Sequence, residues 1–202
     1  MAEYSPMMQH YLATKAEYKD CILFYRLGDF YEMFFDDALT ASKVLEITLT
    51  GRDCGQPERA PMCGVPYHAC DVYLNKLIEN GFKVAICEQV EDPKLAKGIV
   101  KREVIRVVTP GTNMSNAILD ETRNNYLMSI VENDGAFGIS LVDITTGEFK
   151  TARVPSLSKL TDEINKYSPA EIIGNHSFMN CDLDFIYLRA VSYTHLTLPT
   201  IR

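Results

Sequence analysis

The sequence predicts an α/β protein made of two units. Over residues 1–112, apolar runs typical of strands alternate with segments whose apolar residues recur at helical spacing. Over residues 113–188, the pattern changes to three successive strands, one helix and a further strand. The turn sequence TPGT, near residue 111, separates the two patterns and sets the predicted domain boundary. A length of 202 residues is sufficient for two small domains.

The first unit is predicted to begin with a helix. Ser5 has the residue type of an N-cap, and Pro6 suits the first helical position. The apolar and aromatic run over residues 21–27 indicates a strand, and residues 36–46 indicate a helix with acids at its positive end. Residues 47–51 then predict a short strand. We expect these elements to form a mixed sheet with flanking helices.

A segment rich in helix and strand breakers follows. Residues 51–68 contain three glycines and three prolines, so we expect a long loop, a feature that is often functional in compact domains. Helical spacing returns over residues 70–78, and Gly81 suits the end of that helix. Residues 83–90 and 102–111 predict strands on either side of a basic segment.

The second unit has a recognisable order of elements. Residues 125–154 predict three strands, and the turns NDG and TTG within them make antiparallel hairpins. Residues 156–169 predict a capped amphipathic helix, and residues 170–175 another strand. The order β-β-β-α-β is that of the start of a ribonuclease-H-like fold.

The bulk properties exclude several classes of protein. No stretch approaches the roughly 20 apolar residues of a membrane span, and the N-terminal MAEYSPMMQH lacks the basic start and apolar run of a secretory signal. We therefore expect a cytoplasmic protein with no membrane partner. None of the six cysteines forms a C-x-x-C pair, so we expect buried free thiols rather than zinc ligands or disulfides.

The charge of the chain limits how it could bind nucleic acid. A net charge of −7 argues against a domain that grips DNA by electrostatics alone. Five basic residues nevertheless cluster on both sides of residue 100: Lys94, Lys97, Lys101, Arg102 and Arg106. From charge alone, the favoured interpretation of this cluster is a solvated surface run.

The stretch GDFYEMFFDDA, residues 28–38, combines three phenylalanines and a tyrosine with four carboxylates. On a strand, Phe30 and Glu32 would point to the same side, while Tyr31 and Met33 would point to the other. On a helix, the two positions would diverge by about 200°. If Phe30 and Glu32 act together, we therefore expect an extended backbone at this place.

The residues alone leave three interpretations of this stretch open. The first is a half-buried strand whose aromatic residues belong to the core. The second is a metal site, as in a metal-dependent nuclease, although no matching histidine or second acidic motif supports it. Its ligands would be Asp29, Glu32, Asp36 and Asp37. The third is an apolar wedge with a polar reader beside it, because proteins that bind the minor groove insert phenylalanine between base steps.

A wedge of this kind would detect weak base pairing without reading sequence. Unstacking a base step costs a few kcal/mol, and less where the pairing is already poor. Bending also costs less at a deformable site. A carboxylate beside the wedge repels phosphates, but it can accept a hydrogen bond from a base edge that is displaced from normal pairing.

Four motifs extend this interpretation to a known family. In chain order they are FYRLGDFYEMFFDDA, PMCGVPYHA, VAICEQVEDP and VKREVIRVVTPGT. They resemble the N-terminal portion of the MutS family of DNA mismatch repair proteins, and the resemblance covers residues 5–188. It implies a mismatch-recognition domain over residues 1–112, followed by a truncated, ribonuclease-H-like connector domain over residues 113–188.

The resemblance also implies roles for individual residues. Phe30 would stack on the mispaired base from the minor groove, and Glu32 would hydrogen-bond that base, which displaces the core-strand interpretation for Phe30. Gly28 and Asp29 would shape the turn that presents the wedge. The resemblance also implies further DNA-binding positions, and for each of them a structural role stays open: Arg52, Met62, His68 and Arg102.

The partners and cofactors implied by the resemblance belong mostly to a longer chain. The family binds double-stranded DNA with a mismatch or small loop, acts as a homodimer when full length, and contacts a MutL-like repair protein through the connector. Full-length members bind ATP and magnesium and hydrolyse ATP. This chain has no G-x-x-x-x-G-K-[ST] motif, so we expect it to bind no cofactor and to have no ATPase activity.

Two further expectations concern the second half. The ribonuclease-H-like strands do not by themselves make a nuclease, and Asp143 is the one strand acid to consider for catalysis. Residues 189–202, which end in VSYTHLTLPTIR, do not resemble a connector. They resemble a translated sequencing or assembly junction, so we expect that this tail is not natural protein.

Overall fold

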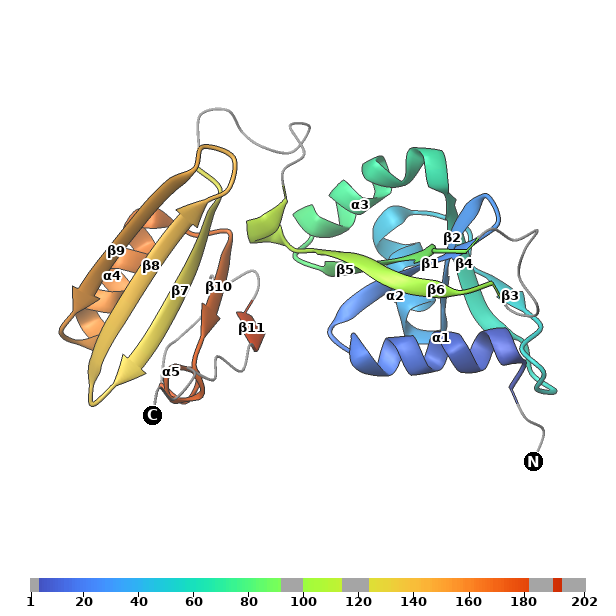
Figure 1. The fold of residues 1–202 in the computed structure, drawn as a ribbon, viewed down its shortest axis with the longest axis horizontal. Coiled ribbons are helices and arrows are strands. Elements are labelled where there is room, and N and C mark those ends of the chain that lie inside the picture. Colours follow the sequence, from blue (N-terminus) through green and yellow to red (C-terminus); the bar gives the residue numbers. More distant parts are fainter. Residues whose placement is uncertain (1–3, 92–99, 114–123, 182–190, 194–202) are drawn as a thin grey trace. The chain divides into compact units, whose positions relative to one another are not determined.

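The structure is a computed structural model that describes residues 4–91, 100–113, 124–181 and 191–193. It divides into two compact units, residues 1–109 and 110–202. Each unit has its own β-sheet and its own helices (Figure 1). The α/β class predicted from the sequence is confirmed.

Within the described part of the first unit, six strands form a mixed sheet in the order β3-β4-β2-β1-β5-β6. β1 is parallel to β5, and the other neighbouring pairs are antiparallel. The strands are β1 (Cys21–Leu27), β2 (Phe30–Phe34), β3 (Thr50–Arg52), β4 (Ala60–Pro66), β5 (Lys83–Gln89) and β6 (Arg102–Val108). The first predicted strand, the strands on either side of the basic segment and the mixed character of the sheet are therefore confirmed.

Helices cover both faces of this sheet. They are α1 (Pro6–Glu17), α2 (Phe35–Leu45), α3 (Cys70–Glu79) and the short 3-10 helix η1 (Tyr67–Ala69). Phe24 and Met33 belong to an apolar cluster with residues of α2 and α3, whereas Tyr25 and Phe34 belong to a second cluster with Met8 of α1. Figure 1 accordingly shows α1 on one side of the sheet and α3 on the other.

The prediction of one long loop over residues 51–68 is wrong. Residues 60–66 form β4, which lies between β2 and β3. Proline lacks the N–H that a strand ladder uses, but Pro61 and Pro66 lie near the two ends of β4. Burial of the apolar side chains between them stabilises the strand despite its breakers. The loop is therefore shorter than predicted, and the DNA-binding candidate Met62 lies on a strand.

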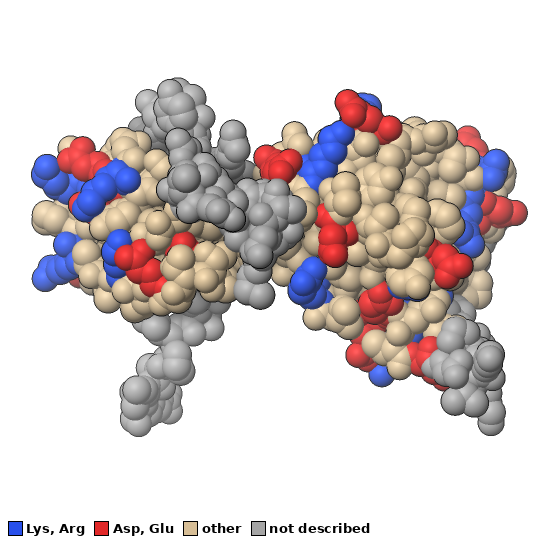
Figure 2. Space-filling model, turned by 90° about the horizontal axis from the view of Figure 1, so that it is seen from above, with Lys and Arg blue, Asp and Glu red and all other residues tan. Residues whose placement is uncertain are grey.

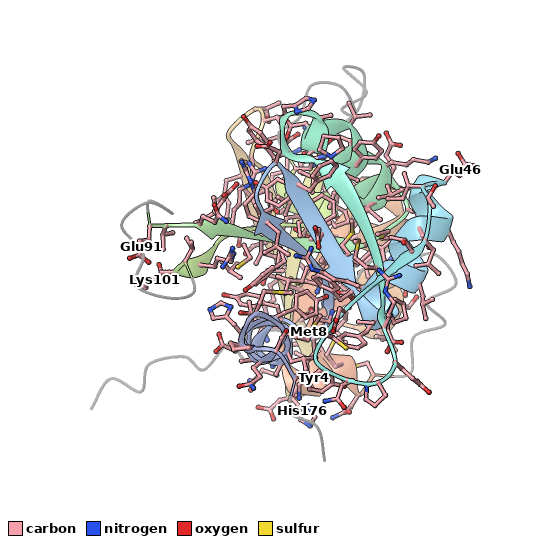
Figure 3. The ribbon with its side chains drawn as sticks, turned by 90° about the vertical axis from the view of Figure 1, so that its right-hand side faces the viewer. Tyr4, Met8, Glu46, Glu91, Lys101 and His176 are labelled. Carbon is pink, nitrogen blue, oxygen red and sulfur yellow. The ribbon has the colours of Figure 1, made fainter. Side chains whose placement is uncertain are left out.

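The β5–β6 ribbon leads to the basic segment. The backbone N–H of Lys101 donates to Oε2 of Glu91 over 3.1 Å. Figure 3 shows these two residues together where the ribbon ends. Lys94 and Lys97 of the predicted basic cluster lie outside the described residues.

The described part of the second unit contains a sheet of five strands in the order β11-β10-β7-β8-β9. Its elements are η2 (Pro110–Thr112), β7 (Tyr126–Asn133), β8 (Ala136–Asp143), β9 (Glu148–Val154), α4 (Leu157–Tyr167), β10 (Glu171–Gly174), α5 (His176–Met179) and β11 (Val191–Tyr193). The predicted β-β-β-α-β order is confirmed. Asp134 and Gly135 both have positive φ, which is the pattern of a type I′ hairpin turn.

Two regions bear on other expectations. In the tail over residues 189–202, β11 pairs in parallel with β10, and the rest of the tail lies outside the described residues. Every helix in the described part of the chain is too short or too polar to cross a lipid bilayer.

Candidate nucleic-acid interface

The hairpin between β1 and β2 presents the stretch that the sequence singles out. Leu27 pairs with Phe30, so Gly28 and Asp29 form a two-residue turn. Gly28 has a φ of +57°, which favours glycine, and a positive φ at the first turn position alone is the pattern of a type II′ turn. Phe30 is therefore the first strand residue after a tight turn. β1 and β2 are the two central strands of the sheet.

Phe30 differs from the other aromatic residues of β2 in its exposure. Its side chain is on the surface at 46% relative exposure, whereas Tyr31 is 5% and Phe34 is 1% exposed. β2 is an extended strand, so Phe30 and Glu32 lie on one face of the sheet, as predicted. The core-strand interpretation thus holds for the neighbours of Phe30 but not for Phe30 itself.

Glu32 lies across the sheet toward Arg52. Its Oε2 is 2.5 Å from Nη1 of Arg52, and the side chains are 12% and 38% exposed. Between them, Gly64 of β4 is the register partner of Glu32. A Cβ at position 64 would lie 3.3 Å from the carbonyl oxygen of Tyr31 and 3.5 Å from Cγ of Glu32. The absence of a side chain there leaves room for the carboxylate to reach Arg52.

The other predicted DNA-binding residues lie in different environments. Met62 of β4 is paired with Phe34 and packs, partly buried, on the cluster beneath α1. His68 is exposed in η1, with its ring edge-to-face to that of Tyr67 at 5.8 Å between centroids. Arg102 is only 8% exposed.

Arg102 uses its guanidinium inside the unit. Its Nε donates to the carbonyl oxygen of Arg26 and its Nη1 to that of Val100, each over 2.8 Å, and its guanidinium carbon lies 5.3 Å from the centroid of the Tyr25 ring. The structure therefore brings Glu32 and Arg52 together beside Phe30, but it gives Arg102 contacts that hold strands to one another.

Sequence reasoning missed Arg26, which lies just before the turn. Its Nε donates to the carbonyl oxygen of Gly28 over 2.5 Å, and its Nη1 is 3.2 Å from Oε1 of Glu88 on β5. Its guanidinium carbon lies 3.8 Å from the centroid of the Tyr67 ring. Glu88 is 62 residues away in sequence, so no local pattern signals this constellation.

Tyr31 completes the group around Glu88. Its hydroxyl also donates to Oε1 of Glu88. Burial, followed by the hydrogen bond to Glu88 and its charge, raises the pKa of Tyr31 well above its ordinary value. The hydroxyl therefore stays protonated and remains a donor at neutral pH.

The described residues do not assemble the acids of the opening stretch into a metal site. Asp37 is buried, 2.9 Å from Nζ of Lys15, and it accepts hydrogen bonds from the N–H of Leu23 and the hydroxyl of Tyr11. Glu32 is paired with Arg52. In the described ranges, no group of three or more histidine, cysteine or acidic side chains is placed to hold a metal ion. No observation therefore favours a metal-dependent nuclease.

One face of the first unit carries charges of both signs. On the face that Figure 2 shows, acidic and basic side chains are interspersed among neutral ones.

Two known family models match the chain. Residues 5–117 match the family described as MutS domain I, and residues 125–186 match MutS domain II. The chain belongs to the MutS family. The resemblance predicted from four motifs is thereby confirmed.

Curated relatives carry the same name. The DNA mismatch repair protein MutS of Lachnoclostridium phytofermentans is 68% identical over 184 residues, which are 91% of this chain and 20% of that protein. The protein of the same name from Acetivibrio thermocellus is 62% identical over 183 residues, which are 89% of this chain and 21% of that protein. The chain thus spans about a fifth of the length of the MutS relatives that it matches.

In the part that matches MutS domain II, Asp143 has a structural environment. Its side chain is fully buried and accepts hydrogen bonds from the N–H groups of Asn125 and Thr145 and from the Thr145 hydroxyl, over 3.0, 2.9 and 2.6 Å. Burial acts to raise the pKa of Asp143, but these bonds outweigh it and hold the pKa below its ordinary value. Asp143 therefore holds the turn after β8.

Proposed function

We propose that this chain recognises mismatched or looped double-stranded DNA in mismatch repair, with Phe30 as a wedge and Glu32 as the contact to the mispaired base. The observation that carries the proposal is the exposure of Phe30, 46%, at the tip of a hairpin in a member of the MutS family. Glu32 lies on the same face of the same strand.

The position of Phe30 suits insertion into DNA. An exposed phenylalanine ring contributes little to the core, and its transfer from water to the space between base steps is favourable. β2 is hydrogen-bonded to β1 on one side and β4 on the other, so the ring is presented on a firm support. The energy of unstacking then falls on the duplex, and it is lower where the pairing is weak.

The pairing of Glu32 with Arg52 suits a site close to phosphates. A bare carboxylate would be repelled by the DNA backbone, and the guanidinium of Arg52 offsets that charge. In the complex, we expect Glu32 to accept a hydrogen bond from the mispaired base while Arg52 turns toward a phosphate. Met62 would contact the minor groove, and His68 would contact the backbone. We assign Arg102 a supporting role through Arg26.

The activities of the longer family members are proposals for a full-length chain. These are ATP hydrolysis with magnesium, homodimer formation, and contact with a MutL-like repair protein through the unit that matches MutS domain II. We propose no ATP-binding residue within this chain.

The test uses residues 5–186 of this chain grafted into the full-length MutS of L. phytofermentans, since 68% identity favours intact packing. Binding to a duplex with one G·T mismatch is compared with binding to the matched duplex. Phe30→Ala should abolish the preference and leave a folded protein. Val72→Ala is the control, because Val72 is 71% exposed in the same unit, on α3. A preference that survives Phe30→Ala would refute the wedge.

A further inference from the structure

We propose that Arg26 is a positioning residue for the wedge: it holds the Gly28–Asp29 turn that orients Phe30, without touching the DNA. This inference rests on the proposed function of Phe30. Arg26 would thereby determine how well the site distinguishes a mismatch from a normal base pair.

Arg26 acts on the turn from the opposite face of the sheet. Arg26 pairs with Tyr31, and Leu27 pairs with Phe30, so the Arg26 side chain leaves the strand on the face away from Phe30. Its Nε nevertheless reaches the carbonyl oxygen of Gly28 at 2.5 Å. The side chain is only 16% exposed, which leaves little of it free for a phosphate.

The second turn residue is held by the same group of contacts. The N–H of Tyr67 donates to the carbonyl oxygen of Asp29 over 2.9 Å. The Tyr67 ring lies over the Arg26 guanidinium at 3.8 Å. Both carbonyl groups of the turn are therefore bonded, one by Arg26 and the other by the residue stacked on Arg26.

Arg26 is in turn fixed by its neighbours. Its Nη1 is 3.2 Å from Oε1 of Glu88. Its own carbonyl oxygen accepts from Nε of Arg102 over 2.8 Å. The chain of contacts thus runs from β6 and β5 through Arg26 to the turn, and from there to the first residue of β2.

These contacts require arginine rather than lysine. A planar guanidinium can donate to Gly28 and Glu88 while its face stacks on Tyr67, whereas an ammonium group lacks both the fork and the flat face. One of these contacts goes directly to the turn and another to Tyr67, whose N–H bonds the turn, so loss of the Arg26 side chain should loosen the turn first.

The experiment uses the full-length graft carrying Arg26→Gln or Arg26→Lys. The measured quantity is the ratio of the dissociation constants for matched and G·T duplexes. The fluorescence of a 2-aminopurine next to the mismatch reports unstacking by the wedge. We expect both variants to lower the ratio about tenfold, which corresponds to about 1.4 kcal/mol. The 2-aminopurine signal should fall with it, and matched-duplex affinity should stay within about twofold.

Arg153→Gln is the matched control, because it removes the same charge from an exposed position on β9. It should leave the ratio and the fluorescence unchanged. A parallel loss of affinity for both duplexes in Arg26→Gln and Arg26→Lys would mean a general loss of fold and would overturn the inference. If Arg26→Gln does not fold, Arg26→Lys decides: full discrimination by that variant overturns the inference, and reduced discrimination supports it.

Phe30→Ala in the same graft separates this inference from the function on which it rests. If Phe30→Ala keeps the mismatch preference, the proposed function fails and the inference fails with it. If Phe30→Ala loses the preference and both Arg26 variants keep it, the wedge stands and only the positioning role of Arg26 is refuted.

Discussion

Glu32 and Arg52 form an ion pair of 2.5 Å across the sheet, between strands β2 and β3, which are separated by β4. The acid that shares a face with the exposed Phe30 is thus neutralised by a residue that follows it by twenty positions in the chain. The proposed function requires this pair to separate. Glu32 would then accept a hydrogen bond from a base, and Arg52 would turn toward a phosphate.

Replacement of Arg52 by glutamine should weaken binding to matched and mismatched DNA alike. The carboxylate of Glu32 would lose its compensating charge and would repel the duplex, whatever its sequence. We expect a loss of about five- to tenfold on both duplexes, with a smaller dependence of binding on salt. Titrations at two salt concentrations measure both effects. A loss confined to the mismatched duplex would contradict this prediction.

Replacement of Gly64 by alanine should disturb Glu32. The new Cβ would lie 3.3 Å from the Tyr31 carbonyl oxygen and 3.5 Å from Cγ of Glu32. We expect a loss of about 1–2 kcal/mol in the free energy of unfolding, together with weaker mismatch preference. The control is Gly138→Ala on β8, where a Cβ would meet nothing within 4 Å. Equal behaviour of the two variants in urea unfolding would show that position 64 is not crowded.

Phe30 and Phe34 should differ in their contribution to stability, although they lie on one strand. Phe34 is 1% exposed and Phe30 is 46% exposed. Phe34→Ala should therefore lower the free energy of unfolding by about 3–5 kcal/mol, and Phe30→Ala by much less. Chemical denaturation of the two variants measures the difference. Similar losses would place Phe30 in the core and would leave no ring for a wedge.

His10 should make the first unit sensitive to mild acid. Burial, and then the charge of Arg102, lower the pKa of His10, and its Nδ1 lies 2.9 Å from the Tyr25 hydroxyl. The unfolded chain binds the proton more readily, with a pKa of about 6.5. The stabilisation is therefore present above about pH 6.5 and is lost as the pH falls toward the lower folded pKa.

The His10→Gln variant checks this sign. Its melting temperature should fall less than that of the parent protein between about pH 7 and about pH 5, because glutamine does not titrate. Carboxylates contribute equally to both proteins, so the difference between the two curves isolates His10. Parallel curves would show that His10 does not contribute to the pH dependence.

Local patterns in the sequence predicted most elements but could not predict their long-range contacts. The first strand of the hairpin was predicted from its apolar run, whereas the Gly28–Asp29 turn was expected from the family resemblance. Strand β4 was missed because its glycine and prolines dominate the local pattern, whereas its stability comes from pairing with β2 and β3. Tertiary context overrides propensity there.

For the site too, local patterns could be predicted from the sequence and long-range contacts could not. The common face of Phe30 and Glu32 follows from strand periodicity once an extended backbone is assumed at this place. The contact of Arg26 with Glu88 depends on the register between β1 and β5, and no short window of sequence contains that register. For the same reason, the burial of Arg102 could not be foreseen from a cluster of basic residues.

The hairpin that carries Phe30 is built from the two central strands of its sheet, with further strands on both sides. In mechanical terms, such a hairpin is a stiff beam, held by β4 along the whole of β2 and by β5 along β1 as far as Tyr25. Under the proposed function, a bound duplex would therefore have to bend more than the protein. Selectivity would then depend on how easily each duplex bends, because the protein would keep its shape and the DNA would change its own.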